Sequence, residues 1–355
     1  MAQTDNHLVI MAGGVGGRFW PMSTADCPKQ FIDVLGVGRT LIQLTYDRFS
    51  GVVSADNVWV VTNQKYVSLV HEQLPEIPLN HILSEPCRRN TAPCIAYVSW
   101  RIKKENPKAN IVVSPSDHIV TNENEFKRVV SNCLKFTAET DAVVTLGMKP
   151  TRPETGYGYI QADLSTASAR NREIYRVDQF REKPDLETAE QYIKQSNFFW
   201  NAGIFIWSAS TIVNAFRIYQ PSIARIFERI MNILDTPDEQ RVIDEVYPEC
   251  ENISVDYAIM EKAEEIFVCP ADFGWSDLGT WGSLLAQTKH DIYGNAVIGT
   301  DVHLFDSKNC IVHTTEERKV VIQGLDGYIV AEQEGKLLIC RLSEEQRLKQ
   351  FTGEG

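Results

Sequence analysis

Residues 9–31 combine a glycine-rich turn with two positively charged side chains, a combination that suits phosphate groups. The segment begins as the apolar run VIMA and continues with four glycines within five positions. Glycines after a strand let backbone N–H groups approach an anion, because no Cβ atom stands in the way. Arg18 adds a planar cation that matches phosphate oxygens, and Lys29 supplies a second positive charge. The pattern indicates an anion-binding loop, with a tight strand-to-helix turn as the alternative.

This loop matches neither of two common phosphate-binding motifs. A dinucleotide-binding fingerprint would require a glycine where Phe19 stands. A Walker loop would require Gly-Lys-Ser or Gly-Lys-Thr after four spacer residues, and that sequence is absent. The loop alone therefore leaves both the anion site and the simple turn open.

Asp117, in the sequence PSDH, is a candidate metal ligand. It follows a β-branched run at the place where a parallel strand is expected to end, and ligands of open α/β sheets bind beyond such strand ends. Mg²⁺ prefers oxygen ligands and commonly takes one or two carboxylates together with phosphate oxygens. A helix cap or a loop turn is the alternative for this aspartate. We interpret His118 as structural or as a neighbour of the metal ligand, because Mg²⁺ disfavours imidazole.

The elements that must position these groups alternate between strand-like and helix-like patterns. Strand-like runs occupy 7–12, 57–62, 109–120 and 141–148, and helix-like runs occupy 40–49, 65–74 and 91–107. Such alternation predicts βαβ units and a mostly parallel sheet covered by helices. Short β-rich runs replace this pattern after about residue 286. We therefore predict an α/β domain over residues 1–285 and a small β-rich domain over residues 286–355.

Composition excludes several classes of protein. With 43% hydrophobic and 23% charged residues, the chain reads as a soluble globular protein with a sizeable core. A formal net charge of −12 argues against nucleic-acid binding. No run approaches the length of a membrane span, and the polar N-terminus lacks the apolar core of a signal peptide. Eight scattered cysteines without a C-x-x-C pair are typical of free thiols, so we expect a cytoplasmic protein.

The full set of motifs resembles the sugar-1-phosphate nucleotidyltransferase family. G-G-x-G-x-R is followed by W-P and by P-K-Q-F, and further family motifs recur in order. These motifs are EPCRRNTAP (85–93), SPSDHIV (114–120), ETGYGYI (154–160), REKP (181–184), WNAGIFIW (200–207), SVDYAIMEKA (254–263) and GWSDLGTW (274–281). The resemblance extends from residue 8 to about residue 283. Thr24 departs from the family pattern, which often has arginine at this position. The departure concerns one auxiliary contact and not the reaction.

The resemblance implies an activity and an architecture. It implies transfer of the GMP moiety of GTP to α-D-mannose 1-phosphate, giving GDP-mannose and pyrophosphate by Mg²⁺-assisted in-line attack on the α-phosphorus. It also implies a Rossmann-like catalytic domain and a C-terminal domain similar to a partial left-handed β-helix, through which relatives self-associate, so we expect a homodimer. Some relatives carry a further isomerase domain of cupin type. Since this chain has 355 residues, we expect the transferase activity alone.

The resemblance also implies roles for individual residues in binding the nucleotide. Arg18, Lys29 and Asp117 are the implied catalytic residues, because phosphoryl-type transfer depends on positioning and charge neutralisation. Asp277, in WSDLG, is the implied second metal ligand beside Asp117. The implied nucleotide-binding residues are Ala12, Gly13, Gly14, Gly16, Arg18, Lys29, Glu85, Asn90 and Thr91. Glu85 is the candidate acceptor for the N–H groups of guanine, with a turn cap as the alternative.

The implied sugar-phosphate site consists of Gly158, Glu182, Lys183 and Asn201. Gly158 permits close approach of the backbone to a hydroxyl group, and Glu182 and Asn201 offer directional hydrogen bonds. Lys183 can meet the sugar phosphate. A solvated charge pair is the alternative for Glu182 and Lys183.

Two other functions stay open at this point. The chain could use another nucleoside triphosphate or another hexose 1-phosphate. It could also be a sugar-nucleotide-binding regulator without catalytic activity, although the presence of Arg18, Lys29, Asp117 and Asp277 disfavours that interpretation.

Overall fold

The computed structural model describes residues 5–14, 19–314 and 318–352, and the chain divides into two compact units. The first unit contains Met1–Gly13, Tyr46–Pro115 and Val120–Trp275, and the second contains Gly14–Thr45, Ser116–Ile119 and Ser276–Gly355. The chain passes between the units five times: after Gly13, within α1 (Leu41–Arg48), after Pro115, within β5 (Ile119–Val120) and within β11 (Trp275–Ser276).

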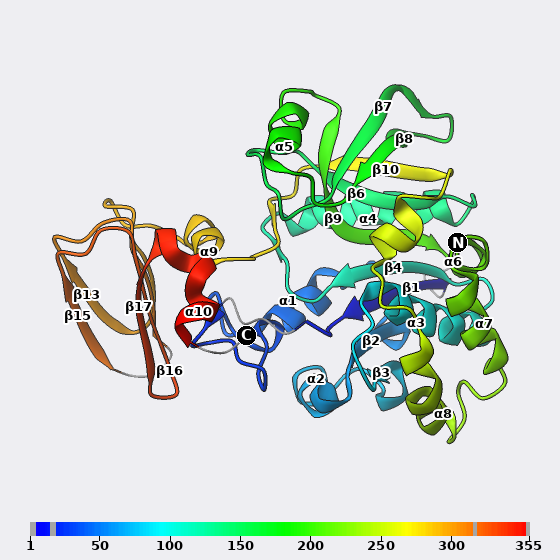
Figure 1. Cartoon of the computed structure of the whole chain (residues 1–355), viewed down its shortest axis with the longest axis horizontal. Coiled ribbons are helices and arrows are strands. Elements are labelled where there is room, and N and C mark those ends of the chain that lie inside the picture. The colour runs from blue at the N-terminus through cyan, green and yellow to red at the C-terminus, as the bar shows by residue number, and fades with distance from the viewer. Residues whose placement is uncertain (1–4, 15–18, 315–317, 353–355) are drawn as a thin grey trace. The chain divides into compact units, whose positions relative to one another are not determined.

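A nine-stranded sheet in the order β3-β2-β1-β4-β9-β6-β10-β8-β7 forms the centre of the first unit (Figure 1). Its strands are β1 (Asn6–Met11), β2 (Val58–Asn63), β3 (Ile82–Glu85), β4 (Asn110–Pro115), β6 (Val143–Met148), β7 (Tyr159–Ser168), β8 (Asn171–Arg181), β9 (Phe198–Ser208) and β10 (Ile266–Ala271). The pairings give one direction to all of these strands except β8 and β9, which run against the rest. β2 and β4 are continuous buried apolar runs, as expected of parallel strands covered on both faces.

The helices of the first unit pack along this sheet and bury a large apolar cluster. They are α2 (Val67–Gln73), α3 (Thr91–Glu105), α4 (Glu123–Thr137), α5 (Leu186–Tyr192), α6 (Ala209–Tyr219), α7 (Pro221–Arg229) and α8 (Glu239–Val246), with the shorter turns η4 (Ala55–Asn57), η5 (Gln64–Tyr66), η6 (Leu79–His81), η7 (Tyr247–Glu249) and η8 (Asp256–Met260). Trp100 of α3 packs against Phe216 of α6 and Phe227 of α7.

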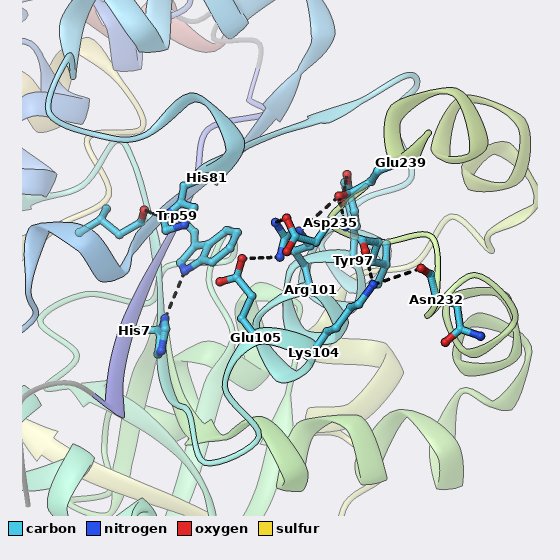
Figure 2. A network of polar contacts seen from close by, with 12 residues as sticks. His7, Trp59, His81, Tyr97, Arg101, Lys104, Glu105, Asn232, Asp235 and Glu239 are labelled. Carbon is cyan, nitrogen blue, oxygen red and sulfur yellow. Dashed lines mark hydrogen bonds and ion pairs between the residues drawn. The ribbon is translucent and has the colours of Figure 1, made fainter. Parts of the chain in front are cut away.

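The buried side chain of Arg101 joins α3 by ion pairs to the segment that leads into α8, as Figure 2 shows. Only 1% of the Arg101 side chain is exposed, so its charge depends on protein partners. It pairs with Glu105 at 2.5 Å, with Glu239 at 3.3 Å and with Asp235, and its guanidinium lies 5.3 Å from the ring centre of Trp59. This network fixes the start of α8.

The second unit is rich in strands that pair in parallel. Its elements are β12 (Ala296–Ile298), β13 (Asp301–Phe305), β14 (Ile311–Thr314), β15 (Lys319–Gln323), β16 (Tyr328–Gln333), β17 (Lys336–Arg341), η3 (Lys29–Phe31), α9 (Trp281–Gln287), η9 (Leu342–Arg347) and α10 (Leu348–Thr352). β14 pairs in parallel with β12 and β16, and β13 pairs in parallel with β15, as successive coils of a β-helix do. Phe19, Val34 and Leu41 pack with residues from these strands in one apolar cluster.

The predicted fold class is confirmed, whereas three predicted elements differ. The run 109–120 is interrupted after Pro115. The sequences SVDYAIMEKAEE (254–265) and SEEQRLKQF (343–351) also have patterns that predict helices, but the first forms only the π-helical turn η8 and the second divides into η9 and α10. The domain boundary between residues 285 and 286 stays a prediction. Among the described residues, we find no helix with the length and apolarity that a membrane crossing requires.

Candidate functional site

Gly13 and Glu85 lie together at the carboxyl edge of the parallel strands of the first unit. β1 ends at Met11 and β3 ends at Glu85, and the shared strand direction brings both ends to one edge. A methyl group at position 13 would lie 3.2 Å from Glu85 Oε2. Glycine therefore leaves the space that the carboxyl group borders, at the edge where open α/β sheets bind ligands.

Burial changes the acid strength of Glu85. Its side chain is 8% exposed, and burial raises its pKa to about 7, although the hydroxyl of Tyr247 donates a hydrogen bond to Oε1 and Arg88 adds a positive charge. Tyr247 follows α8, and Gln240 of α8 accepts a hydrogen bond from the neighbouring Ser84 at 2.8 Å. The position of α8 thus determines where the Glu85 carboxyl group lies.

Asn90 and Thr91 serve local structure at the start of α3. The Asn90 side chain accepts a hydrogen bond from the backbone N–H of Thr91 at 2.9 Å, as an N-cap does, and its backbone has a φ of +65°. The Thr91 hydroxyl oxygen accepts from the backbone N–H of Val255 at 2.9 Å. These contacts hold the segment that follows Glu85 in place, and the predicted contacts with a base stay a prediction.

Two of the predicted sugar-site residues lie against a third, Gly158, in the first unit. A methyl group at position 158 would lie 2.5 Å from Glu182 Oε2 and 3.4 Å from Asn201 Cβ, so Glu182 occupies the space that glycine leaves. The backbone N–H of Asn201 donates to the carbonyl of Gly158 at 2.8 Å. The structure therefore brings Gly158, Glu182 and Asn201 into one cluster, which we call the sugar-site cluster.

Lys183 borders this cluster in a strained conformation. Its Nζ lies 3.0 Å from Glu182 Oε1, while 59% of its side chain is exposed. Its φ of +45° lies in the left-handed region, which is unfavourable for residues other than glycine and often marks functional sites. The strain holds an exposed ammonium group beside a largely buried carboxylate.

Sequence reasoning assigned no role to Asp256, which also belongs to this region. Its Oδ1 accepts a hydrogen bond from Asn201 Nδ2 at 3.0 Å, and burial followed by the charge of Glu182 raises its pKa to about 7. It stands in SVDYAIM as a carboxylate within an otherwise apolar, helix-like stretch. That isolated acidic residue was the signal available in the sequence.

Lys29, Asp117 and Asp277 meet in the second unit. The Nζ of Lys29 lies 3.0 Å from Asp117 Oδ2 and donates to the backbone carbonyls of Asp277 and Leu278, each at 3.0 Å. Its three N–H donors therefore match three acceptors. Leu278 has a φ of +48°, so the turn at 277–278 is strained where Lys29 holds it.

The charge of Lys29 stabilises the ionised form of Asp117. Burial opposes ionisation, but the Lys29 ammonium and the neighbouring His118 together lower the pKa of Asp117 below its ordinary value. His118 Nε2 lies 3.8 Å from Asp117 Oδ1. Asp117 is thus a carboxylate at neutral pH.

The carboxylates of Asp117 and Asp277 fit a hard divalent cation by the chemistry of their oxygen donors. Oδ1 of Asp277 also accepts a hydrogen bond from the backbone N–H of Gly279 at 3.1 Å, which orients the carboxylate. Within 5–14, 19–314 and 318–352, no group of three or more His, Cys, Asp and Glu side chains gathers into a metal site. A cation held by these two aspartates would therefore take further oxygens from water or phosphate.

The remaining predicted residues belong to the glycine-rich loop. Gly16 and Arg18 lie outside the described residues. The N–H of Ala12 donates to the carbonyl of Val61 at 2.8 Å, and the Gly14 carbonyl accepts from Gln30 at 2.9 Å. The N–H of Ala12 therefore serves the sheet in this structure.

Comparison with known proteins gives consistent results. The family model for nucleotidyl transferase matches residues 7–293. A mannose-1-phosphate guanylyltransferase of Escherichia coli (strain K12) is 36% identical over 358 residues, which cover 99% of this chain and 74% of that protein. The alginate biosynthesis protein AlgA of Pseudomonas fluorescens is 36% identical, covering 97% of this chain and 70% of its own length.

A solved structure extends the likeness to three dimensions. The crystal structure of a mannose-1-phosphate geranyltransferase from Thermus thermophilus matches with a TM-score of 0.86 and 29% identity, covering 99% of both chains. The match therefore includes the strand-rich C-terminal region as well as the large sheet. From the family model and the relatives together, the chain belongs to the nucleotidyl transferase family.

Proposed function

We propose that this nucleotidyltransferase transfers the GMP moiety of GTP to α-D-mannose 1-phosphate, giving GDP-mannose and pyrophosphate. The observation that carries the proposal is the 36% identity to a mannose-1-phosphate guanylyltransferase over 99% of this chain. The family accounts for a nucleoside triphosphate and a sugar 1-phosphate as the class of substrates. The choice of guanine and mannose comes from the relative.

In the proposed reaction, an oxygen of the sugar phosphate forms a bond to the α-phosphorus of GTP. The bond from that phosphorus to the oxygen shared with the β-phosphate breaks, and pyrophosphate leaves with the electron pair. Such a transfer needs alignment of the reactants and neutralisation of developing charge more than a covalent nucleophile. The roles below are assigned on that basis.

We assign the triphosphate to the glycine-rich loop with Arg18 and Lys29, and a Mg²⁺ ion to Asp117 and Asp277. When bound, Mg²⁺ would neutralise phosphate oxygens and help to orient them. Lys29 would hold Asp117 and the 277–278 turn in position through the contacts described above. Arg18 would stabilise the negative charge that grows on the departing pyrophosphate, and Lys29 would add to this effect through its charge, since its three N–H groups already have acceptors within the protein.

We assign the base to Glu85 and the sugar to the cluster around Gly158. As a carboxylate, Glu85 can accept two hydrogen bonds from the N1–H and the amino group of guanine, which adenine does not offer in that arrangement. Glu182 can accept from sugar hydroxyls, and the exposed ammonium of Lys183 can pair with the sugar phosphate. A homodimer formed through residues 286–355 and a cytoplasmic location are further proposals, which rest on the family resemblance.

The test is pyrophosphate release from GTP with mannose 1-phosphate, compared with ATP, UTP and dTTP, and with glucose 1-phosphate as the alternative sugar. We expect turnover with GTP and mannose 1-phosphate, and its loss when EDTA removes the divalent cation. Faster turnover with another nucleotide or sugar phosphate would replace the proposed substrates. Absence of turnover with every pair, in folded protein supplied with Mg²⁺, would favour a regulator instead.

A further inference from the structure

Contacts on two sides hold the side-chain amide of Asn201 in one orientation. Its Oδ1 accepts from the Thr145 hydroxyl at 2.9 Å and from the backbone N–H of Gly203 at 3.1 Å. Because a backbone N–H can only donate, the atom that faces Gly203 is the oxygen. The amide nitrogen therefore faces Asp256, whose Oδ1 lies 3.0 Å away. Thr145 and Gly203 on the oxygen side and Asp256 on the nitrogen side thus fix together the direction in which Asn201 presents its N–H groups.

Asp256 also lies among charged and polar groups from neighbouring segments. Glu182 and Lys183 follow β8, Ser254 precedes η8, and Glu261 follows η8, where its Oε1 accepts from the Glu182 backbone N–H at 3.2 Å. Burial and the negative charge of Glu182 raise the pKa of Asp256 to about 7, against the opposing effects of Lys183 and Ser254. The charge of the sugar-site cluster therefore changes with protonation of Asp256 near neutral pH.

We propose that Asp256 is a positioning residue of the sugar-phosphate site, which orients Asn201 and takes up a proton when a phosphate monoester binds there. This inference rests on the proposed function, because it takes the sugar-site cluster as the place where the sugar phosphate binds. With Asp256 ionised, a bound phosphate dianion would face two carboxylates, Glu182 and Asp256, and one cation, Lys183. Protonation of Asp256 removes one of these repulsions, so binding and protonation favour each other.

The first experiment is the pH dependence of KM for mannose 1-phosphate with saturating GTP and Mg²⁺. A phosphate monoester with a second pKa of about 6 is mostly a dianion above neutral pH, so its own titration contributes little. In wild-type enzyme we expect KM to rise about tenfold from about pH 7 to about pH 8.5, because less of the enzyme then carries the proton. The KM for GTP, measured in parallel, should not follow this rise.

Two variants at position 256 separate charge from structure. Asp256→Asn stays neutral at every pH and keeps an oxygen that can accept from Asn201, so its KM for mannose 1-phosphate should be independent of pH. Asp256→Ala loses that acceptor, so its KM should be raised at every pH. A role confined to stability would shift the thermal unfolding of these variants without changing the pH profile of KM.

Asp141→Asn is the matched control, because it makes the same change of charge at an exposed position. Asp141 precedes β6 at its amino end, whereas Gly147, near the carboxyl end, pairs with Asn201. Gly147 is six positions after Asp141 along a nearly extended chain, a separation of about 20 Å or about two Debye lengths at moderate ionic strength. This variant should keep the wild-type profile.

Equal pH dependence in wild type and folded Asp256→Asn would overturn the proposal. If that variant does not fold, proton uptake by wild-type enzyme on binding mannose 1-phosphate tests the proposal instead. It is measured by calorimetry at about pH 8 in two buffers of different ionisation enthalpy. We expect uptake of up to one proton, and none would overturn the proposal. If a different hexose 1-phosphate is the substrate, the proposed function fails and the same profile is measured with that sugar.

Discussion

Lys29→Ala removes a side chain that joins three segments of the second unit. In the folded protein, its Nζ contacts the Asp117 carboxylate and the backbone carbonyls of Asp277 and Leu278. The substitution leaves a negative charge and two carbonyl groups without this donor. We therefore expect loss of local stability in addition to any loss of catalysis.

The loss of stability expected from this substitution depends on how exposed Lys29 and Asp117 are. Removing one partner of a fully buried ion pair costs about 3–5 kcal/mol, because the remaining charge is stranded. Here 12% of the Lys29 side chain and 26% of the Asp117 side chain are exposed, so water can solvate part of the stranded charge. We expect the free energy of unfolding to fall by about 2–3 kcal/mol, between the values for surface pairs and for fully buried pairs.

The assay is urea unfolding at neutral pH, combined with hydrogen exchange of peptides that cover 25–31 and 275–281. Exchange in both peptides should accelerate, because Lys29 holds these segments together. Lys336→Ala, at an exposed position of β17, is the matched control and should change neither measurement. A double-mutant cycle with Asp117→Asn should show a coupling of about 1–2 kcal/mol between the two side chains.

The pH dependence of that coupling has a defined sign. The pKa of Asp117 is lowered in the folded state, so its contribution is present above the ordinary aspartate pKa. It is lost as pH falls through the folded-state pKa. In folded enzyme we also expect kcat to fall by about 10²–10³, the usual result of losing one preorganised charge donor. Unchanged stability and exchange, together with a reduced kcat, would refute the structural half of this reasoning.

Three further substitutions test other parts of the structure. Gly158→Ala would place a methyl group 2.5 Å from Glu182 Oε2 and so displace that carboxyl group. We expect steady-state kinetics to show a KM for the sugar phosphate that is raised about tenfold or more. The free energy of unfolding should change by less than about 1 kcal/mol. Burial raises the pKa of Glu85 to about 7, so the native state binds more protons than the unfolded state between about pH 4.5 and about pH 7. The free energy of unfolding therefore falls as pH rises through that range. By urea unfolding, wild-type protein should lose about 3 kcal/mol of stability between these pH values, and Glu85→Gln should lack this loss. Arg101→Met strands the carboxylates of the network in Figure 2 and should cost about 3–5 kcal/mol, also by urea unfolding, whereas no change would mean that the network contributes little.

The strands could be predicted from the sequence because buried parallel strands carry continuous apolar runs. The run 57–62 and the observed β2 (Val58–Asn63) differ by one residue at each end. The predicted helix 91–107 corresponds to α3 (Thr91–Glu105), since Asn90 supplies the cap and apolar residues recur at helical spacing. Local pattern and local structure agree in these elements.

Pairing between distant side chains could not be predicted in the same way. Lys29 and Asp277 are 248 positions apart, and Asn201 and Asp256 are 55 positions apart. Spacing along the chain carries no information about such contacts, so the resemblance to a family supplied the candidates and the structure supplied their partners. Asp256 was missed for this reason, because its neighbours come from β9 and from the segment after β8.

Glu85 and Asp256 share a physical property that stability alone does not explain. Each is an acid whose burial raises its pKa to about 7, so each lowers the stability of the folded chain as pH rises toward neutrality. Only Glu85 lies beside a glycine itself, at Gly13, whereas the glycine of the sugar-site cluster, Gly158, lies beside Glu182, whose charge acts on Asp256. Burying an acid without full hydrogen bonding lowers the stability of a protein core, whereas a binding site tolerates it because the ligand supplies the missing hydrogen bonds or charge. With the nucleotide base proposed by Glu85 and the sugar phosphate by Asp256, we predict that ligand binding changes the protonation of both acids.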